Sequence, residues 1–274
     1  MSRTPHDPSG AAATPPSTRP STPARTPVDV RGTRIGAGRP VVVVPLTSAT
    51  PDALLADAAV VVAAGPDVIE WRVDHLADLA PARVPATGTA LAGALAGLPL
   101  LVTVRTAAEG GHADVDDAAY EALLLAALDA GIADLLDVEV DRDAGTVARL
   151  VARAHAAGVP VVGSSHDFAG TPPQDAIVAT LLGMADAGAD VLKVAVMPHD
   201  PGDVLTLLAA TWEAARRTDR PLITMAMGEL GVASRLAGGT FGSAATFGTV
   251  GAASAPGQVE LGALRAALAV VHPA

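Results

Sequence analysis

The sequence contains no cysteine and few aromatic residues. The absence of cysteine excludes disulfides, thiolate catalysis and cysteine-based zinc sites. Two tryptophans, one tyrosine and three phenylalanines are the only aromatic residues among 274. With so few rings, stacking on nucleobases or sugars is not expected to be the main activity of the protein.

Positive charge and long apolar runs are also scarce. The formal net charge is −11 at pH 7, which argues against a nucleic-acid partner, because such binding needs a basic face. A few placed arginines could still bind a small anion. The apolar run at residues 60–64 stops at Gly65-Pro66-Asp67 and is too short to span a membrane. The start of the chain lacks the apolar core of a signal peptide.

Lysine is almost absent: Lys193 is the only one, and arginine supplies every other basic side chain. This lysine lies in the apolar run Val191-Leu192-Lys193-Val194-Ala195-Val196, which predicts a buried strand. Arginine stays charged, whereas a buried lysine can lose its proton and become a nucleophilic amine. A lysine paired with a carboxylate inside the core is the structural alternative, and position alone leaves both open.

The first 28 residues differ in composition from the rest of the chain. They are rich in Pro, Thr, Ser, Ala and Arg and offer little apolar surface to bury. We predict a disordered extension over residues 1–28, with an organellar transit peptide as the alternative. Residues 29–274 are predicted to form a single domain.

From residue 41 onward, short apolar runs alternate with helix-like segments. Strands are predicted at residues 41–46, 68–73, 100–105, 135–140, 159–164, 191–196, 222–227 and 245–248. Helices are predicted at about 51–64, 88–97, 115–130, 143–156, 174–187, 202–217, 229–237 and 258–271. Eight such units predict an α/β fold of the (β/α)₈ TIM barrel type. A doubly wound open sheet is the alternative, but no G-x-G-x-x-G follows the first strand.

Residues 30–35 precede the first predicted strand of the barrel. We expect them to form a short β element that closes the N-terminal face. In such a barrel, functional residues gather at the C-terminal ends of the strands.

Polar residues at these strand ends are the candidates for chemistry. Alternation along the second strand puts Glu70 and Arg72 on one side, either to bind a polar ligand or to form an internal ion pair. Arg105 ends the third strand, and Glu109 follows in a loop with two glycines. His166 closes the fifth strand, where it could transfer protons near neutral pH.

A lysine on one strand and a histidine on the preceding one suggest Schiff-base chemistry, with Lys193 forming an iminium and His166 moving protons. Arg235 lies early on a short predicted helix, and Ser254 and Gln258 lie in a late loop that could close over a ligand. Each of these three could also be an ordinary loop or helix residue. No set of residues has metal-ligand spacing, and there is no Walker A motif, so no metal or other cofactor is predicted.

In these segments the chain resembles the type I 3-dehydroquinate dehydratase family, in family order over about residues 30–272. The segments are Glu70-Trp71-Arg72-Val73-Asp74, Thr103-Val104-Arg105, Glu109-Gly110-Gly111, Ser165-His166-Asp167-Phe168, Lys193-Val194-Ala195-Val196-Met197-Pro198, Asp203-Val204-Leu205-Thr206, Gly231-Val232-Ala233-Ser234-Arg235, Phe241-Gly242-Ser243-Ala244 and Ser254-Ala255-Pro256-Gly257-Gln258. The family dehydrates 3-dehydroquinate to 3-dehydroshikimate in the shikimate pathway.

The resemblance implies a role for each candidate. Lys193 would form the Schiff base with the substrate ketone, His166 would shuttle protons, and Glu109 would orient His166. Arg235, aided by Ser254 and Gln258, would hold the substrate carboxylate. The resemblance also implies that Glu70, Arg72 and Arg105 bind the hydroxyls and the ketone side of the ring. A cytoplasmic homodimer without a cofactor is implied as well.

Two positions depart from the family pattern, and two other functions compete. Ser165 stands where the family has a larger or amide side chain before the histidine, and Pro45 stands where some relatives have a polar residue. A class I aldolase would also use a lysine, but it is expected to have a phosphate site on its late loops. A non-catalytic barrel is expected to lack the lysine or the histidine, and both are present here.

Overall fold

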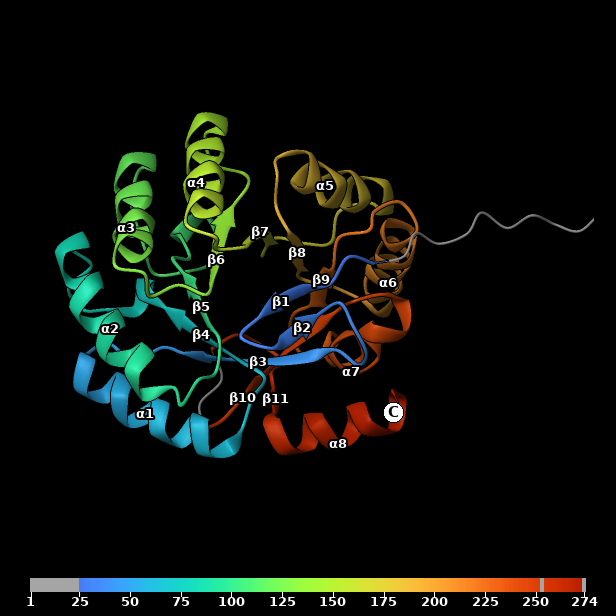
Figure 1. The fold of residues 1–274 in the computed structure, drawn as a ribbon. Coiled ribbons are helices and arrows are strands. Elements are labelled where there is room, and N and C mark those ends of the chain that lie inside the picture. Colours follow the sequence, from blue (N-terminus) through green and yellow to red (C-terminus); the bar gives the residue numbers. More distant parts are fainter. Residues whose placement is uncertain (1–24, 252–253, 273–274) are drawn as a thin grey trace, which may run out of the picture.

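The computed structural model describes residues 25–251 and 254–272 and shows a (β/α)₈ barrel (Figure 1). The barrel strands are β3 (Val41–Leu46), β4 (Val68–Arg72), β5 (Leu100–Thr103), β6 (Leu135–Glu139), β7 (Val161–Asp167), β8 (Val191–Val196), β9 (Leu222–Ala226) and β10 (Ala245–Thr249). The helices are α1 (Pro51–Ala64), α2 (Val84–Ala94), α3 (Asp117–Asp129), α4 (Ala144–Ala156), α5 (Gln174–Asp186), α6 (Pro201–Ala215), α7 (Val232–Phe241) and α8 (Leu261–Val271). The predicted barrel is therefore confirmed.

Strand order decides between the barrel and the open sheet. The strands from β3 to β9 pair in parallel in sequence order, and β10 pairs with β3. The ring closes between β9 and β10, where the amide of Ala244 donates to the carbonyl of Leu222 over 2.6 Å. The sheet order has no reversal, so the doubly wound alternative is wrong. A two-residue strand, β11 (Val259–Glu260), adds to β10 before α8.

An antiparallel hairpin closes the N-terminal end of the barrel, as the sequence predicts. Strands β1 (Val28–Val30) and β2 (Thr33–Ile35) pair, and Val30 and Ile35 join the buried interior cluster of the barrel. The chain contacts the barrel before residue 29, since Thr26 hydrogen-bonds to Asp219 through its amide and its hydroxyl. The predicted extension therefore overlaps the packed chain at residues 25–28, and residues 1–24 lie outside the described residues.

Helix boundaries follow local capping signals. Thr50 caps α1 by accepting from the amide of Ala53, and Gly65 ends the helix in the left-handed region. Asp200 caps α6 in the same way. Helix α2 begins at Val84, four residues before the predicted range, because Pro85 is accommodated at an early helical position.

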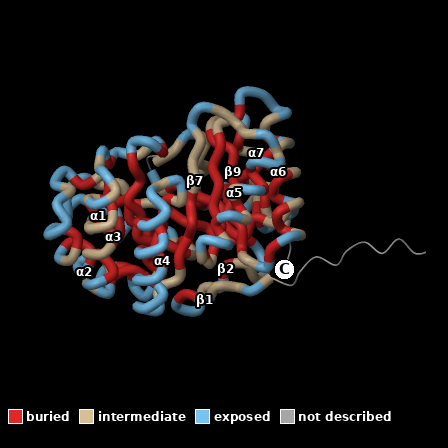
Figure 2. The backbone as a smooth tube through the Cα atoms, turned by 90° about the horizontal axis from the view of Figure 1, so that it is seen from above, coloured by how far each residue is buried: buried red, intermediate tan, exposed pale blue. Residues whose placement is uncertain are grey.

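The barrel interior is layered. Apolar side chains such as Val43, Val68 and Leu101 fill its N-terminal half with the hairpin. Buried charged residues, among them Asp137 and Lys193, lie toward the C-terminal half. In Figure 2 the buried residues follow the strands, whereas the helices carry both buried and exposed residues. This arrangement places the charged layer directly beneath the loops where an active site is expected.

Candidate active site

One cavity opens at the C-terminal ends of the strands. All nine residues singled out from the sequence line it: Glu70, Arg72, Arg105, Glu109, His166, Lys193, Arg235, Ser254 and Gln258. They come from strands, loops and one helix that are up to 188 residues apart in the chain (258 − 70).

Lys193 lies on β8 and is only 4% exposed. Its Nζ is 3.1 Å from Oδ2 of Asp137 and 3.9 Å from Oε1 of Glu70. The ring of Phe247 lies 4.9 Å from the same nitrogen. The two alternatives posed by the sequence are thus not exclusive, because the amine is paired with a carboxylate and also faces the cavity.

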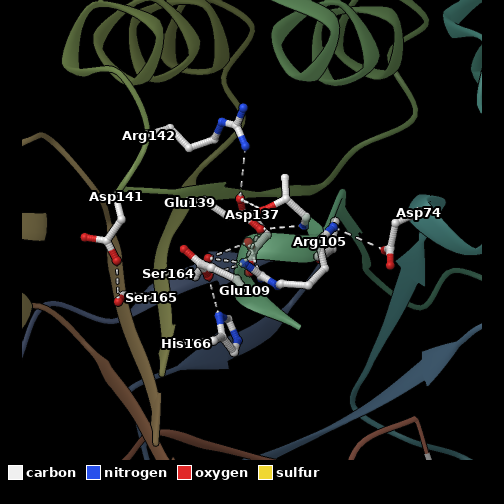
Figure 3. Close-up of polar contacts among 12 residues, drawn as sticks. Asp74, Arg105, Glu109, Asp137, Glu139, Asp141, Arg142, Ser164, Ser165 and His166 are labelled. Carbon is white, nitrogen blue, oxygen red and sulfur yellow. Dashed lines mark hydrogen bonds and ion pairs between the residues drawn. The ribbon is translucent and has the colours of Figure 1, made fainter. Parts of the chain in front are cut away.

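His166 and Glu109 form the second functional unit. Nδ1 of His166 lies 2.7 Å from Oε2 of Glu109 (Figure 3). Burial, helped by the positive charges of Arg105 and Lys193, lowers the pKa of His166 well below its ordinary value. The imidazole is therefore uncharged near neutral pH and can accept a proton.

The loop that carries Glu109 depends on two glycines. Gly110 has a φ of +75° and lies against the ring of Phe168, and a Cβ added to Gly111 would lie 2.1 Å from the carbonyl oxygen of Arg105. The chain turns back tightly here, with the amide of Ala113 donating to that same carbonyl oxygen over 3.2 Å. This turn brings the Glu109 carboxyl within hydrogen-bond distance of His166 and ends β5 at Thr103, two residues before the predicted limit.

Burial raises the pKa of Glu109 to about 8, and nearby carboxylates oppose its ionisation further. The stability that this proton contributes is fully present below the ordinary pKa of 4.5 and is lost as the pH rises through about 8. We expect the free energy of unfolding to fall by about 1 kcal/mol between about pH 7 and pH 9 through this group. Thermal unfolding of the wild type and of Glu109→Gln at both pH values measures the difference, about 2–4 °C in melting temperature. An equal change in melting temperature between the two pH values in the wild type and in Glu109→Gln would contradict this expectation.

Arg105 is buried within carboxylates rather than projecting freely into the cavity. Its Nη1 donates to Glu109 at 2.9 Å and to Glu139 at 3.0 Å, and its Nη2 donates to Asp137 at 2.6 Å (Figure 3). Nη1 also donates to the hydroxyl of Ser164 at 3.1 Å. The guanidinium therefore holds three acidic side chains in place, a role that the sequence alone did not indicate.

Glu70 and Arg72 point into the barrel from β4 but do not form the ion pair considered from the sequence. Arg72 binds Asp74 with both Nε and Nη2 at 2.7 Å. Glu70 instead accepts from the hydroxyl of Thr103 at 2.9 Å. Glu70 is thus positioned beside Lys193, and Arg72 at the cavity wall.

Arg235, near the start of α7, is a buried cation without an acidic partner among the described residues. It is 2% exposed, and its Nη2 donates to the carbonyl of Pro256 at 3.1 Å. Its Nε has no hydrogen-bond partner within the described ranges. Burial lowers the pKa of Arg235 to about 10, so the side chain remains charged at neutral pH. An uncompensated cation on a cavity wall favours an anionic ligand.

Ser254 and Gln258 lie together in the loop above Arg235. The amide of Ser254 donates to Oε1 of Gln258 at 2.8 Å, and Nε2 of Gln258 donates to the Ser254 hydroxyl at 3.0 Å. The preceding residues 252–253 lie outside the described residues. The loop thus presents two polar side chains to the same cavity as Arg235.

Comparison with known proteins decides the family. The family model described as type I 3-dehydroquinase matches residues 42–274. The chain belongs to the type I 3-dehydroquinase family. The 3-dehydroquinate dehydratase of Klebsiella pneumoniae subsp. pneumoniae is 48% identical over 240 residues, which are 87% of this chain and 96% of that protein.

Solved structures agree with the family. The 3-dehydroquinate dehydratase of Geobacillus kaustophilus has a TM-score of 0.87 at 37% identity, over 90% of this chain and 97% of that one. The type I 3-dehydroquinate dehydratase of Clostridium difficile, solved with covalently modified comenic acid, has a TM-score of 0.87 at 38% identity. The match covers 90% of this chain and 98% of the Clostridium difficile protein.

This type I 3-dehydroquinase holds further polar residues in its site that sequence reasoning missed. Asp137 and Glu139 on β6 and Ser164 on β7 are fully buried and bind Arg105. A signal for the first two was present, because Asp137 and Glu139 share one face of an otherwise apolar strand. Carboxylates on a buried strand require partners, and the partner that both share, Arg105, lies just after β5.

The described part of this dehydroquinase contains neither a metal-binding cluster nor a helix that could span a membrane. Residues 25–251 and 254–272 contain no group of three or more His, Cys, Asp or Glu side chains placed to hold a metal ion. None of the helices in these ranges combines the length and hydropathy needed to cross a membrane.

Proposed function

We propose that the protein dehydrates 3-dehydroquinate to 3-dehydroshikimate through a Schiff base on Lys193. The observation that carries this proposal is the convergence of three groups on one cavity: a buried amine, a His–Glu pair and an arginine that has no acidic partner among the described residues. Membership of the type I 3-dehydroquinase family supports the reaction.

Lys193 supplies the covalent step. Its neutral amine attacks the ketone carbon, and the resulting carbinolamine loses water to leave a protonated imine. The positive nitrogen then accepts the electrons of the adjacent C–H bond as its proton leaves. The enamine formed in this way expels the hydroxyl group on the next carbon, and water hydrolyses the product imine to release the amine.

His166 moves the protons of these steps. Because its imidazole is uncharged, it can take a proton from a carbon or a carbinolamine and return it to the departing hydroxyl group. The 2.7 Å contact with Glu109 orients the ring. The strands β7 and β8 are hydrogen-bonded neighbours, with Ser164 opposite Lys193, so the histidine is held on the strand beside the amine.

The remaining residues bind the substrate. Arg235, with Ser254 and Gln258 beside it, provides the binding site for the carboxylate. Glu70, Arg72 and Arg105 are proposed to contact the hydroxyl and ketone side of the ring, with Arg105 acting mainly through the carboxylates that it holds. The net acidic protein can bind an acidic substrate because the positive charge is local.

Replacing Arg235 with glutamine is expected to lower kcat/KM by ~30–1000-fold, which corresponds to losing about 2–4 kcal/mol from a buried charge pair. The melting temperature is expected to stay the same or rise, because a buried cation without an acidic partner destabilises the free protein. Steady-state kinetics tests the expected loss of kcat/KM, and thermal unfolding tests the expected melting temperature. A matched control is Arg149→Gln, which removes an exposed arginine paired with Glu121. Loss of melting temperature in parallel with loss of activity would show that Arg235 serves the fold and not an anionic ligand.

The proposed reaction is tested by borohydride trapping with 3-dehydroquinate, followed by mass spectrometry of the peptides. A reduced adduct on Lys193 is expected, and since this is the only lysine, the assignment of the modified side chain is direct. A folded protein without an adduct would exclude the Schiff base with this substrate.

We also propose that the protein is a cytoplasmic homodimer that needs no cofactor, as the family resemblance implies. Light scattering coupled to gel filtration measures the mass in solution. A mass equal to that of one chain would exclude the dimer.

A further inference from the structure

Two carboxylates face the nitrogen of Lys193, and they differ in distance. Oδ2 of Asp137 lies 3.1 Å from Nζ, within hydrogen-bond range, whereas Oε1 of Glu70 lies 3.9 Å away and already accepts from Thr103. Asp137 has no exposed surface. It is therefore the carboxylate in direct contact with the atom at which the proposed reaction takes place.

The orientation of Asp137 is fixed by two neighbours, Arg105 just after β5 and Ser164 on β7. Its Oδ1 accepts from Nη2 of Arg105 and from the hydroxyl of Ser164, both at 2.6 Å. The second oxygen, Oδ2, is thereby directed at Lys193. Burial by itself would raise the pKa of Asp137, but the charges of Arg105 and Lys193 outweigh it and hold the pKa below its ordinary value.

We propose that Asp137 is the counterion of the iminium that forms on Lys193. This inference rests on the proposed function, because it concerns the same nitrogen after it has bonded to the substrate. The amine, the ketone and one proton give the iminium and one water, so the nitrogen becomes positive and keeps one hydrogen. That N–H can donate to Oδ2 of Asp137, as the free lysine does.

The counterion has a defined chemical effect. Only the protonated imine withdraws electrons strongly enough to release the adjacent carbon-bound proton. Its positive nitrogen is neutralised when the enamine forms, whereas a neutral imine would have to become an anion. A positive nitrogen at a site that is 4% exposed needs a nearby negative charge to remain protonated. Asp137 provides it without moving.

The other groups around Lys193 are less suited to stabilise a positive charge on its nitrogen. From β4 comes Glu70 at 3.9 Å, and from β10 the ring of Phe247 at 4.9 Å. His166 on β7 is uncharged near neutral pH, and Arg105 is positive and would oppose protonation. Asp137 is thus the closest anion and the one in hydrogen-bond contact.

The test measures the protonation of the imine directly. Cyanoborohydride reduces iminium ions and not neutral imines, so the rate of trapping with 3-dehydroquinate as a function of pH reports the pKa of the imine. In Asp137→Asn, whose side chain has nearly the same shape, we expect the midpoint to fall by about 1–3 pH units. We expect kcat to fall ~100-fold, as for the loss of one charge-stabilising group in an active site.

Glu139→Gln is the matched control. Glu139 is a buried carboxylate on the same strand that also binds Arg105, but it does not contact Lys193. Its trapping midpoint is expected to remain at the wild-type pH. A change of the midpoint in Asp137→Asn alone would therefore be due to the contact with Nζ and not to a general loss of negative charge.

An unchanged midpoint in folded Asp137→Asn would overturn the counterion. If circular dichroism shows that this variant does not fold, Ser164→Ala replaces it, because it removes one of the two hydrogen bonds to Oδ1 of Asp137, leaves the one from Arg105, and should shift the midpoint by about 1 pH unit. An unchanged midpoint there would overturn the counterion too. Failure to trap any adduct in the wild type would instead reject the proposed function.

Discussion

Lys193→Arg is expected to abolish turnover and to leave the fold intact. Arginine cannot lose its proton and cannot form an imine, so the covalent route is closed. We expect kcat to fall by at least ~10⁴-fold, as when the nucleophile of an enzyme is removed. The positive charge remains beside Asp137, so the buried carboxylate keeps a partner.

The measurement combines steady-state dehydration of 3-dehydroquinate with circular dichroism and thermal unfolding. A folded variant without activity and without a borohydride-trapped adduct is the expected result. Substantial activity in folded Lys193→Arg would exclude the lysine as the nucleophile, and the site would then have to work by direct proton transfer.

His166→Ala is expected to slow turnover by ~10²–10⁴-fold, which is the usual contribution of a group that transfers protons. The loss should appear in kcat more than in KM, because the proposed role of His166 is in the steps after binding. The Schiff base on Lys193 should still form, though slowly, so the trapped fraction separates loss of proton transfer from loss of the nucleophile.

His155→Ala is the control for this variant. His155 lies on the outer helix α4, where its Nε2 is 2.8 Å from Asp190, and it does not line the cavity. Its removal is expected to leave kcat at the wild-type value. A normal rate for His166→Ala at neutral pH would remove His166 from the mechanism.

The regular part of the fold was predictable because its signals are local. Each barrel strand is a short apolar run, and each helix begins or ends at a capping residue such as Thr50, Asp200 or Gly65. The predicted helix at residues 51–64 and the predicted strands at 41–46 and 191–196 have the observed bounds. One miss is the end of β5, where the chain turns back on itself and Gly111 packs on the backbone of Arg105.

The candidate residues were predictable for a related reason. In a parallel barrel all strands end at one face, so polar residues at strand ends meet wherever they lie in the sequence. This rule predicts the place of His166 from the sequence alone. Lys193 lies in the middle of its strand and was instead found as the only lysine of the chain, in an apolar run. The rule could not indicate Asp137, which lies in the middle of an apolar strand, whereas Glu139 is the last residue of β6 and was missed although the rule covers it.

The sequence by itself determined the barrel and the end of the barrel at which the cavity lies, because the apolar periodicity of strands and helices is a local property of the chain. It also identified Lys193 as a candidate, because it is the only lysine. Only the tertiary structure decided which charges pair. Arg72 binds Asp74, Asp137 binds Lys193, and Arg235 is left without an acidic partner among the described residues. The physical reason is clearest for Asp137 and Lys193, which lie on β6 and β8: the register and stagger of the strands around the barrel bring together groups far apart in the chain.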